Sequence, residues 1–462
     1  MPEAAAPTSF DLVVLGGGSG GYAAALRAAE LGMSVAMVEK DKVGGTCLHR
    51  GCIPTKALLH AGEVADTARD GASFGIQTSL DKVDMPAVVA YQQAVVAKLY
   101  KGLQGLVKSR RITVIEGTGR LVAPDTVEVD GTRYTGRDVV LASGSYSRSL
   151  PGLDIDGQRV ITSDHAIALD HVPVSAIVLG GGVIGVEFAS AWTSLGVDVT
   201  IVEALPRLVP AEDEAVSKML ERAFRRRKIG FRTGVRFAGV EHTDDGVRVS
   251  LENGDTLDAE LLLVAVGRGP ATAGLGYEEA GVRVDRGFVP VDERLRTNLE
   301  HVRAVGDIVP GLQLAHRGFG QGIFVAEDIA GLNPAPIDEL GIPRVTYCDP
   351  EIASMGLTEA QAREEYGAEN VATVQYDLAG NGKSQILKTA GFVKLVRRVD
   401  GPVIGLHMVG SRMGEQVGEA QLIFNWEALP SEVAALLHAH PTQNEALGEA
   451  HMALAGKPLH VH

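Results

Sequence analysis

The stretch FDLVVLGGGSGGYAAALRAAELGMSVAMVEK, residues 10–40, has the residue pattern of a strand, a turn, a helix and a second strand. Phe10–Leu15 is a short apolar run, Tyr22–Leu31 is Ala-rich, and Ser34–Val38 is a second apolar run. Between the first run and the predicted helix lies the pattern G-x-G-x-x-G, formed by Gly16, Gly18 and Gly21. In such a unit the glycines permit a tight turn, the approach of a pyrophosphate and close helix packing. The stretch therefore predicts a dinucleotide site.

The same design occurs a second time. SAIVLGGGVIGVEFASAWTSLGVDVTIVEA, residues 175–204, repeats the order of elements, and its turn contains Gly180, Gly182 and Gly185. Its second strand ends at Glu203, as the first unit ends at Glu39. A carboxylate at this position can bind ribose hydroxyls and repels a 2′-phosphate, which favours NAD over NADP in the second unit. Two units predict two dinucleotides, a bound flavin and a diffusible nicotinamide, between which a hydride passes.

Two of the three cysteines lie in GGTCLHRGCIPTK, residues 44–56, directly after the first unit. Cα atoms five residues apart in a regular helix are separated by roughly 8 to 9 Å, whereas a disulfide requires less than about 7 Å. A bond between Cys47 and Cys52 therefore requires an interrupted helix, which Gly51 permits. The alternative is a metal site, but no second cysteine pair or histidine set completes four ligands, so we expect no metal. Cys348 stands alone and is expected to be a small buried residue.

Composition restricts the partners and the compartment. The formal net charge of the 462 residues is −15, which argues against nucleic acid and anionic membrane as partners. No apolar run is long enough to span a bilayer. The N-terminal MPEAAAPTSF lacks the basic start and apolar run of a signal peptide and is expected to be a short leader. Three cysteines are too few for a disulfide scaffold. We therefore expect a cytoplasmic protein.

The remaining chain mixes strands and helices. A helix is expected near Met85–Val107, and a β-rich stretch follows it up to Leu141. After the second dinucleotide unit, the strand in HVRAVGD is expected to end at Asp307. The C-terminal part is expected to contain strands at 392–399 and 403–410 and helices at 414–426 and 431–437.

Four motifs together resemble one protein family. They are G-G-T-C-x4-C-I-P-T-K, the two dinucleotide units, HVRAVGD and the C-terminal HAHPTQNEA. From about residue 10 to about residue 459, the chain resembles the class I pyridine nucleotide–disulfide oxidoreductases. The resemblance implies an α/β fold with two Rossmann-like domains, for FAD and NAD, and a C-terminal α+β dimerisation domain. The implied boundaries are 1–150 for the first part of the FAD domain, 151–272 for the NAD domain, 273–343 for the central FAD part, and 344–462 for the interface domain.

The resemblance also implies roles for the reactive residues. Cys47 would exchange disulfide with the substrate, and Cys52 would lie beside the flavin as the charge-transfer thiolate. Thiol–disulfide exchange needs a thiolate, and a histidine oriented by a carboxylate can take the proton near neutral pH. His440 is the implied base, Glu445 orients it, and His438 has no direct proton role. In the family this base reaches the disulfide of the other subunit, so the implied active unit is a homodimer.

Cofactor contacts are implied in the same way. Thr46 and Lys56 would lie close to the flavin, with Lys56 paired to Glu187, and Asp307 would bind the ribityl chain. The alternative is that Asp307 caps a turn at the end of a strand, but the Gly–Asp ending and the upstream Thr297 favour the cofactor role. The full implied set of cofactor-binding residues is Gly16, Gly18, Gly21, Glu39, Thr46, Lys56, Ser143, Gly144, Asp307, Gly180, Gly182, Gly185, Glu187, Glu203, Gly267 and Ala315.

Within the family, the sequence most resembles the dihydrolipoyl dehydrogenases. This implies oxidation of protein-bound dihydrolipoamide with reduction of NAD+, and as partner a lipoyl-bearing acyltransferase of a 2-oxo acid dehydrogenase complex or a lipoyl carrier protein. Two alternatives stay open, a reductase of a low-molecular-weight disulfide and a non-catalytic structural or moonlighting subunit. Three residues depart from the common family pattern without an evident role: His49, Arg50 and Asn444. Ser143 also stands at a position that is commonly Thr.

Overall fold

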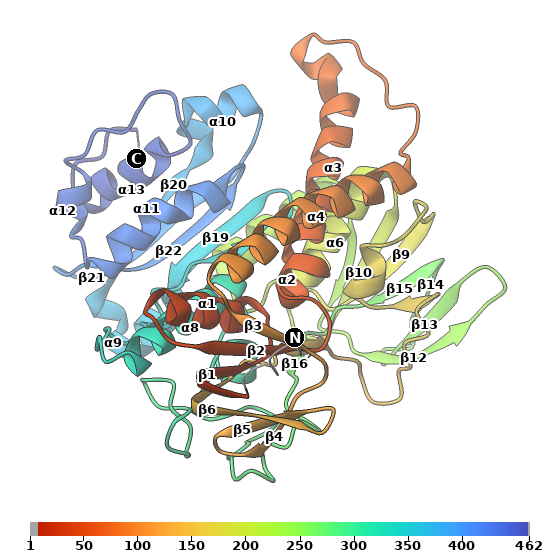
Figure 1. Cartoon of the computed structure of the whole chain (residues 1–462). Helices are drawn as coiled ribbons and strands as arrows, with labels where there is room; N and C mark the ends of the chain where they lie inside the picture. The colour runs from red at the N-terminus through yellow and green to blue at the C-terminus, as the bar shows by residue number, and fades with distance from the viewer. Residues whose placement is uncertain (1–7, 461–462) are drawn as a thin grey trace. The chain divides into compact units, whose positions relative to one another are not determined.

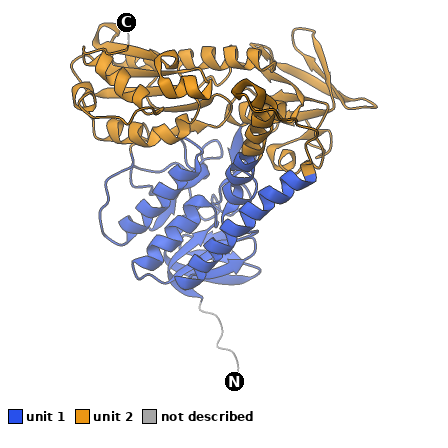
Figure 2. Cartoon of the chain, turned by 90° about the horizontal axis from the view of Figure 1, so that it is seen from above, with its two compact units in different colours: residues 1–57, 86–148, 267–337 blue, residues 58–85, 149–266, 338–462 orange. Residues whose placement is uncertain are grey.

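The computed structural model of the chain describes residues 8–460 and divides them into two compact units, which Figure 2 shows in different colours. Unit 1 contains the residues up to 57, 86–148 and 267–337, and unit 2 contains 58–85, 149–266 and the residues from 338 onward. The first seven residues of the expected leader lie outside the described residues. The chain leaves unit 1 and returns to it twice. The division of the chain into four segments that form three functional domains stays a prediction.

Unit 1 is built on one sheet with the strand order β3-β2-β1-β6-β5-β4, in which β17 also pairs with β6 (Figure 1). The neighbours β3, β2, β1, β6 and β17 run parallel, and β5 and β4 extend the sheet in antiparallel fashion. The strand bounds are β1 Ser9–Leu15, β2 Val35–Glu39, β3 Thr113–Glu116, β4 Arg120–Ala123, β5 Thr126–Val129, β6 Thr132–Leu141 and β17 Val302–Ala304. A separate antiparallel ribbon pairs β7 Ser145–Ser147 with β16 Arg268–Pro270.

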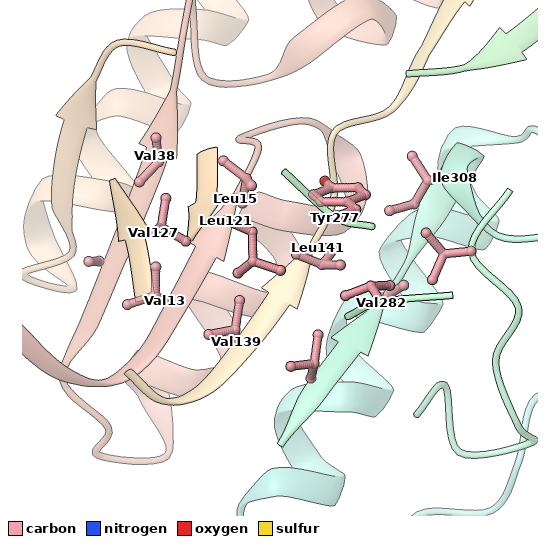
Figure 3. Packing of buried hydrophobic residues seen from close by; sticks show 14 of the residues in the cluster. Val13, Leu15, Val38, Leu121, Val127, Val139, Leu141, Tyr277, Val282 and Ile308 are labelled. Atoms are coloured by element: carbon pink, nitrogen blue, oxygen red, sulfur yellow. The ribbon is translucent and has the colours of Figure 1, made fainter. Parts of the chain in front are cut away.

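The parallel part of this sheet is buried on both faces. Val13 and Leu15 of β1 face one apolar cluster, and Leu12 and Val14 face another, as the two-residue period of a strand requires. Figure 3 shows the first cluster, in which Tyr277 and other later residues pack against β1 and β6. The second cluster lies between the sheet and two helices, α1 (Ser19–Glu30) and α8 (Ala315–Ile329). A sheet covered on both faces is typical of the parallel α/β fold that the sequence predicts.

The helices of unit 1 position the thiol pair and the first glycine turn. They are α1 Ser19–Glu30, α2 Gly45–His49 and α8 Ala315–Ile329; α3 Cys52–Asp70 begins in unit 1, and α4 Met85–Ser109 lies in it from its second residue onward. Helices α1 and α8 approach closely, and Gly322 permits this. A Cβ atom at Gly322 would lie only 2.3 Å from the carbonyl oxygen of Gly20.

Unit 2 contains a second parallel sheet, with the order β11-β10-β9-β15-β8. Its strands are β8 Val160–Ile161, β9 Ser175–Leu179, β10 Asp198–Glu203, β11 Gly230–Thr233 and β15 Leu261–Val264. The helices of this region are α5 Ser163–Ala166, α6 Val183–Leu195 and α7 Glu214–Arg226. A three-stranded antiparallel sheet adjoins it in sequence, formed by β12 Phe237–His242, β13 Val247–Leu251 and β14 Thr256–Ala259. The succession β9-α6-β10 repeats β1-α1-β2, as predicted.

The C-terminal part of unit 2 is an antiparallel sheet with helices, in the order β18-β19-β22-β21-β20. The strands are β18 Arg344–Thr346, β19 Glu351–Gly356, β20 Val371–Asp377, β21 Phe392–Arg398 and β22 Val403–Gly410. The helices are α9 Glu359–Tyr366, α10 Gly382–Leu387, α11 Met413–Asn425, α12 Pro430–Val433 and α13 Glu445–Leu454. Cys348 is free and buried, as expected.

A buried ion pair joins the two sheet regions of unit 2. Asp213, which is 2% exposed, caps α7 by accepting a hydrogen bond from the backbone N–H of Ala215. Its carboxylate also lies 2.7 Å from Nζ of Lys394, in β21, and accepts the backbone N–H of Glu359 at 3.0 Å. Burial by itself raises the pKa of Asp213, but these bonds outweigh burial and hold that pKa below its usual value.

Two predicted elements differ from the structure. The strand before Asp307 ends at Ala304, and Asp307 lies in the short 3-10 helix Gly306–Ile308, which follows the extended residue Val305. Asp307 is therefore not the residue that caps the turn. The helix expected at 431–437 is only the single turn α12, and Leu437 beyond it is 100% exposed. Among residues 8–460, no helix is both long enough and apolar enough to cross a membrane.

Candidate active site

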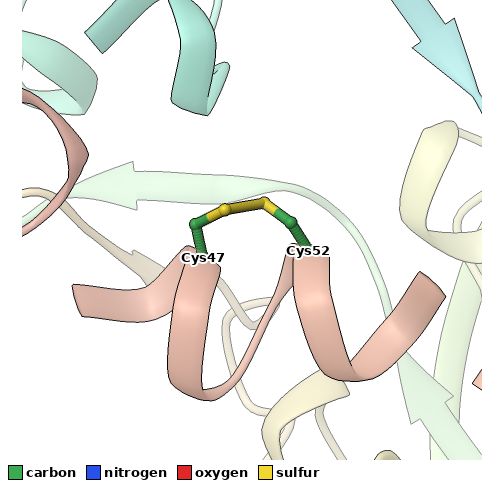
Figure 4. Close-up of a disulfide and its surroundings, with 2 residues drawn as sticks. All are labelled: Cys47 and Cys52. Atoms are coloured by element: carbon green, nitrogen blue, oxygen red, sulfur yellow. A yellow bond between two sulfur atoms is a disulfide. The ribbon is translucent and has the colours of Figure 1, made fainter. Parts of the chain in front are cut away.

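Cys47 and Cys52 form a disulfide across a break between two helices (Figure 4). Helix α2 ends at His49, and α3 begins at Cys52. The intervening Arg50 has φ −140°, outside the helical region, and brings the two cysteine Cα atoms to 4.6 Å. The interrupted helix that the spacing requires is thus confirmed, and the break falls at Arg50 and Gly51.

The first glycine turn contacts the segment that leads into α2, through a hydrogen bond from the N–H of Gly44 to the carbonyl oxygen of Gly17, and it is packed tightly. Gly16 has φ +109°, and a Cβ atom there would lie 2.3 Å from the carbonyl oxygen of Ala142. A Cβ atom at Gly21 would lie 1.8 Å from the carbonyl oxygen of Gly16. Gly18 is different, because its nearest neighbour would be the Cα atom of Gly45 at 4.0 Å. Close packing within the chain therefore requires glycine at positions 16 and 21. Gly18 has no such close contact and leaves the backbone accessible at the start of α1.

The second glycine turn has the same division of roles. Gly180 has φ +113°, and a Cβ atom there would lie 2.4 Å from the carbonyl oxygen of Ala265. A Cβ atom at Gly185 would lie 1.9 Å from the carbonyl oxygen of Gly180. Gly182, the cap of α6, has no atom within 4 Å of its Cβ position. Each turn thus presents one unobstructed glycine at a helix N-terminus, as a bound pyrophosphate requires.

The carboxylates at the ends of β2 and β10 also make equivalent hydrogen bonds in the two units. One oxygen of Glu39 accepts the backbone N–H of Gly17 at 2.7 Å, and the other accepts that of Asp41 at 2.9 Å. Glu203 binds the backbone N–H groups of Gly181 and Leu205 in the same way, at 2.6 and 2.8 Å. Each carboxylate therefore holds its turn in place, and each oxygen keeps a lone pair for a ribose hydroxyl.

A pocket of about 300 Å³ adjoins Glu39 in unit 1. It lies between α4 and β3 and combines apolar walls with charged groups; it is lined by Glu39, Asp41, Val43, Tyr100, Gln104, Val107, Lys108, Ile112, Val114 and Glu116. A pocket of this size beside a strand-end carboxylate fits the adenosine end of a dinucleotide. The open glycine, the carboxylate and the pocket of unit 1 together fit FAD.

Asp307 belongs to a polar cluster, some of whose members were not predicted from the sequence. Its carboxylate accepts a hydrogen bond from Oγ of Ser145 at 2.5 Å, and Nε of Arg268 donates to the same Oγ at 2.8 Å. Oγ of Ser143 lies 2.8 Å from the hydroxyl of Tyr277, whose pKa is raised by complete burial. Ser145, Arg268 and Tyr277 belong to no sequence motif that would predict these contacts, because their hydrogen-bond partners are distant in the sequence.

The other predicted cofactor contacts are distributed over both units. Gly144 and Gly267 have positive φ angles, +75° and +110°, and Ala315 is the first residue of α8. Thr46 lies in α2. Glu187 is 2% exposed and accepts the backbone N–H of Tyr347 at 2.9 Å. Lys56 belongs to unit 1 and Glu187 to unit 2, so their pairing stays a prediction.

In unit 2, Nδ1 of His440 lies 2.8 Å from Oε1 of Glu445, the first residue of α13. The other carboxylate oxygen accepts the backbone N–H of Thr442 at 2.7 Å. Partial burial raises the pKa of Glu445, but the bonds from Thr442 and His440 prevail and keep that pKa below its usual value. Glu445 thus stays ionised near neutral pH and fixes the proton on Nδ1, which leaves Nε2 of a ring that is 76% exposed to accept another proton.

A second histidine–carboxylate pair supports the same loop. Nε2 of His438 lies 2.8 Å from Oε1 of Glu419, in α11, and the side-chain amide of Asn444 donates to the other oxygen of Glu419. The hydrogen bond to Glu419 raises the pKa of His438. Asn444, which had no evident role in the sequence, therefore anchors the segment between the two histidines and α13.

The comparisons with known proteins identify the family. Residues 10–322 match the model of the pyridine nucleotide-disulphide oxidoreductases, and residues 342–451 match the dimerisation domain of the same family. The chain belongs to this family. Its members use FAD and NAD(P), and the chain is a disulfide flavoprotein oxidoreductase with a redox-active Cys47–Cys52 pair. The match to the dimerisation domain supports a homodimer.

Individual relatives cover nearly the whole chain. A dihydrolipoyl dehydrogenase of Bacillus subtilis (strain 168) is 40% identical over 473 aligned residues, which cover 98% of this chain and 99% of that protein. A leghemoglobin reductase of Glycine max is 36% identical, with 97% of this chain and 88% of that protein covered. The crystal structure of LpdA from Mycobacterium tuberculosis has a TM-score of 0.90 at 29% identity, with 97% and 100% covered.

Proposed function

We propose that this flavoprotein is a dihydrolipoyl dehydrogenase, which oxidises protein-bound dihydrolipoamide to lipoamide and reduces NAD+ to NADH. The observation that carries the proposal is the pair His440–Glu445, an exposed imidazole held at 2.8 Å by a carboxylate in a chain that also has a redox disulfide. A dithiol substrate must lose a proton before it attacks a disulfide, and this pair can accept it. The 40% identity with the Bacillus subtilis dihydrolipoyl dehydrogenase supports the same substrate.

In the proposed reaction, the partner subunit's His440 takes a proton from one thiol of dihydrolipoamide, and the thiolate attacks Sγ of Cys47. The S–S bond breaks, and the electron pair of that bond stays on Cys52. The second substrate thiol then attacks the mixed disulfide, which releases lipoamide and leaves Cys47 and Cys52 reduced. Glu445 keeps the Nδ1 proton in place while Nε2 gains and loses its proton.

FAD, when bound, supplies the two-electron acceptor that links the dithiol to NAD+. We propose that Gly18, Glu39 and Thr46 hold it in unit 1, together with Ser143, Gly144, Asp307, Ala315 and the remaining residues expected there. Gly182 and Glu203 would hold NAD+ in unit 2. Glu203 disfavours the 2′-phosphate of NADP, because its negatively charged carboxylate lies at the glycine turn and would repel the phosphate.

The homodimer is supported by an apolar surface near the catalytic loop. Large apolar side chains between residues 422 and 437 are exposed in the single chain, namely Leu422, Trp426, Leu429, Leu436 and Leu437. Exposed apolar side chains gathered in one segment are typical of a contact surface. We propose that a lipoyl-bearing acyltransferase of a 2-oxo acid dehydrogenase complex, or a lipoyl carrier protein, delivers the substrate. The cytoplasmic location stays a prediction.

The experiment that tests the proposal is a substrate matrix. The FAD-loaded protein is assayed for kcat/KM with dihydrolipoamide and NAD+, and separately with glutathione and mycothiol disulfides and either NADH or NADPH. We expect dihydrolipoamide with NAD+ to give the highest kcat/KM by at least about a hundredfold, because only a dithiol uses both exchange steps. Negligible turnover of dihydrolipoamide beside rapid reduction of another disulfide would reject the proposal in favour of a reductase. No turnover with any substrate would favour a structural subunit.

A further inference from the structure

The two residues between the thiols that had no role in the sequence, His49 and Arg50, both contact the segment that connects β2 to α2. Nε2 of His49 lies 2.9 Å from the carbonyl oxygen of Val43, and Arg50 forms an ion pair with Asp41 at 2.8 Å. The His49 ring also packs edge-on against Tyr100, with 4.9 Å between ring centroids. Arg50 and Asp41 are 48% and 42% exposed, so water weakens their attraction. His49 is therefore the stronger anchor.

The acceptor of this anchor is itself firmly held. Val43 is 7% exposed, and the next residue, Gly44, donates its N–H to the carbonyl oxygen of Gly17 at 2.8 Å. Gly44 has φ +112°, and a Cβ atom there would lie 2.5 Å from Cδ2 of Leu48 and 3.2 Å from Nε2 of His49, so the glycine leaves room for both side chains. A carbonyl can only accept, so Nε2 carries a proton and donates it. The contact thus joins the loop between the thiols to the first glycine turn.

We propose that His49 is a positioning residue that lowers the reduction potential of the Cys47–Cys52 pair. In the oxidised protein the covalent bond holds the loop in its interrupted conformation, with the cysteine Cα atoms 4.6 Å apart. Reduction adds two electrons and two protons, breaks the S–S bond and yields two thiols. The covalent restraint is then lost, and the hydrogen bond of His49 is the stronger of the two side-chain contacts that oppose relaxation of the loop.

The direction of the effect follows from this difference between the two redox states. Without the anchor, the dithiol can relax toward a regular helix, in which the Cα atoms would be roughly 8 to 9 Å apart. The disulfide form cannot relax, because its covalent bond remains. Loss of the anchor therefore favours the dithiol and makes the pair easier to reduce. With the anchor, each thiol stays close to the other, and the disulfide re-forms more readily.

The proposal rests on the redox activity of the thiol pair and not on dihydrolipoamide as the substrate. It is tested with dithiothreitol, a small dithiol that becomes a cyclic disulfide as the protein disulfide becomes two thiols. The FAD-loaded full-length protein is equilibrated without oxygen at graded ratios of reduced to oxidised dithiothreitol, quenched in acid and alkylated after denaturation. Mass spectrometry then counts modified Cys47 and Cys52, with Cys348, the free cysteine, as an internal reference.

Three variants separate the hydrogen bond from other effects. His49→Leu removes the donor and keeps a bulky side chain, and we expect half-reduction at a ratio about fivefold lower, equivalent to about 20 mV for a two-electron couple. His49→Gln keeps a side-chain N–H at a similar position, so its midpoint should return most of the way to wild type. Arg50→Gln removes only the exposed ion pair and should leave the midpoint unchanged.

Two results overturn the proposal: an unchanged midpoint in His49→Leu, or equal shifts in His49→Leu and His49→Gln. If His49→Leu does not retain FAD, His49→Phe takes its place, because it keeps an aromatic ring beside Tyr100 but has no N–H to donate to Val43. The expected direction is the same, and an unchanged midpoint in His49→Phe then overturns the proposal. A protein without dihydrolipoamide activity but with the expected midpoints would reject the proposed substrate and leave the role of His49 standing.

Discussion

The imidazole of His440 is held at 2.8 Å from the carboxylate of Glu445, the first residue of α13. The position of Glu445 has two consequences. Its second oxygen binds the backbone of the same loop, through Thr442, so the loop and the ring are fixed by one carboxylate. A helix N-terminus also favours negative charge, which keeps Glu445 ionised. The pair is therefore suited to accept a proton repeatedly without losing its orientation.

Replacing this carboxylate tests its orienting role. We expect Glu445→Gln to lower kcat for dihydrolipoamide oxidation by about ten- to a hundredfold, less than the loss of about a hundredfold or more for His440→Gln, because the base itself remains. Oxidation of NADH by ferricyanide, which needs no thiol exchange, serves as the control and should be unchanged in both variants. Equal loss of both activities would indicate a general structural defect instead.

The proposed action of His440 across the dimer predicts complementation. Heterodimers of a Cys47→Ser subunit and a His440→Gln subunit, isolated through two different affinity tags, should show about half of the wild-type activity, because one of their two sites is complete. The two parent homodimers should be nearly inactive. If the heterodimer is as inactive as its parents, the base does not act on the disulfide of the other subunit.

Substitution of Gly182, the unobstructed glycine of the second turn, can separate an effect on ligand binding from an effect on packing. Gly182 has no atom within 4 Å of its Cβ position, so Gly182→Ala should fold with a Tm close to that of wild type. A dinucleotide that approaches the backbone there would be displaced, and we expect KM for NAD+ to rise about tenfold or more. Gly239→Ala, at another unobstructed position of unit 2, is the matched control and should change neither value. An unchanged KM in Gly182→Ala would place the pyrophosphate elsewhere.

The buried ion pair of unit 2 predicts a large effect on stability. Lys394→Met leaves the carboxylate of Asp213 buried without its cation, and we expect a loss of about 3–5 kcal/mol in the free energy of unfolding. Lys218→Met removes a lysine from an ion pair in which both side chains are more than 60% exposed, and should change stability by less than about 1 kcal/mol. Urea denaturation of both variants measures the difference. Similar values for the two would contradict the importance of the buried pair.

The pair His438–Glu419 predicts a pH window for stability. The raised pKa of His438 stabilises the folded protein fully below its usual value of 6.5, and this contribution is lost as pH rises through the folded pKa. Burial raises the pKa of Glu419, but the bonds from His438 and Asn444 lower it overall. Its contribution is therefore present above its usual value of 4.5 and lost as pH falls through the folded pKa.

The difference in Tm between wild type and Glu419→Gln should accordingly be largest between pH 4.5 and 6.5 and decrease toward pH 9. Differential scanning calorimetry across this range measures it. Glu364→Gln, which changes an exposed carboxylate in α9, is the control and should show no such maximum. A difference that does not vary with pH would mean that the two side chains do not form an ion pair in solution.

Local patterns predicted most of the fold. The strand at β1 and the helix at α4 were placed within two residues, because an apolar run and a helical period are properties of the segment itself. The helix expected at 431–437 was too long, since Leu436 and Leu437 look like a core face but are 60% and 100% exposed. A sequence pattern cannot distinguish side chains that face the core of the chain from those available to a partner.

The candidate site was predictable where one segment carries it. Cys47 and Cys52 are close in sequence, and so are His440 and Glu445. The cluster of Ser145, Arg268 and Asp307 was not predictable, because Ser145 is more than a hundred residues away in sequence from the two side chains that it contacts. The roles of His49 and Asn444 became visible only through their contacts with Val43 and Glu419.

A single-turnover experiment tests the central claim most directly. The oxidised, FAD-loaded protein is mixed without oxygen and without NAD+ with one equivalent of dihydrolipoamide per site, then quenched and alkylated. We predict that Cys47 and Cys52 become modified in step with the appearance of lipoamide, and that adding NAD+ before the quench restores the disulfide with one NADH formed per site. Formation of lipoamide before NAD+ is added while Cys47 and Cys52 stay unmodified, or undiminished turnover in Cys47→Ser, would contradict the account.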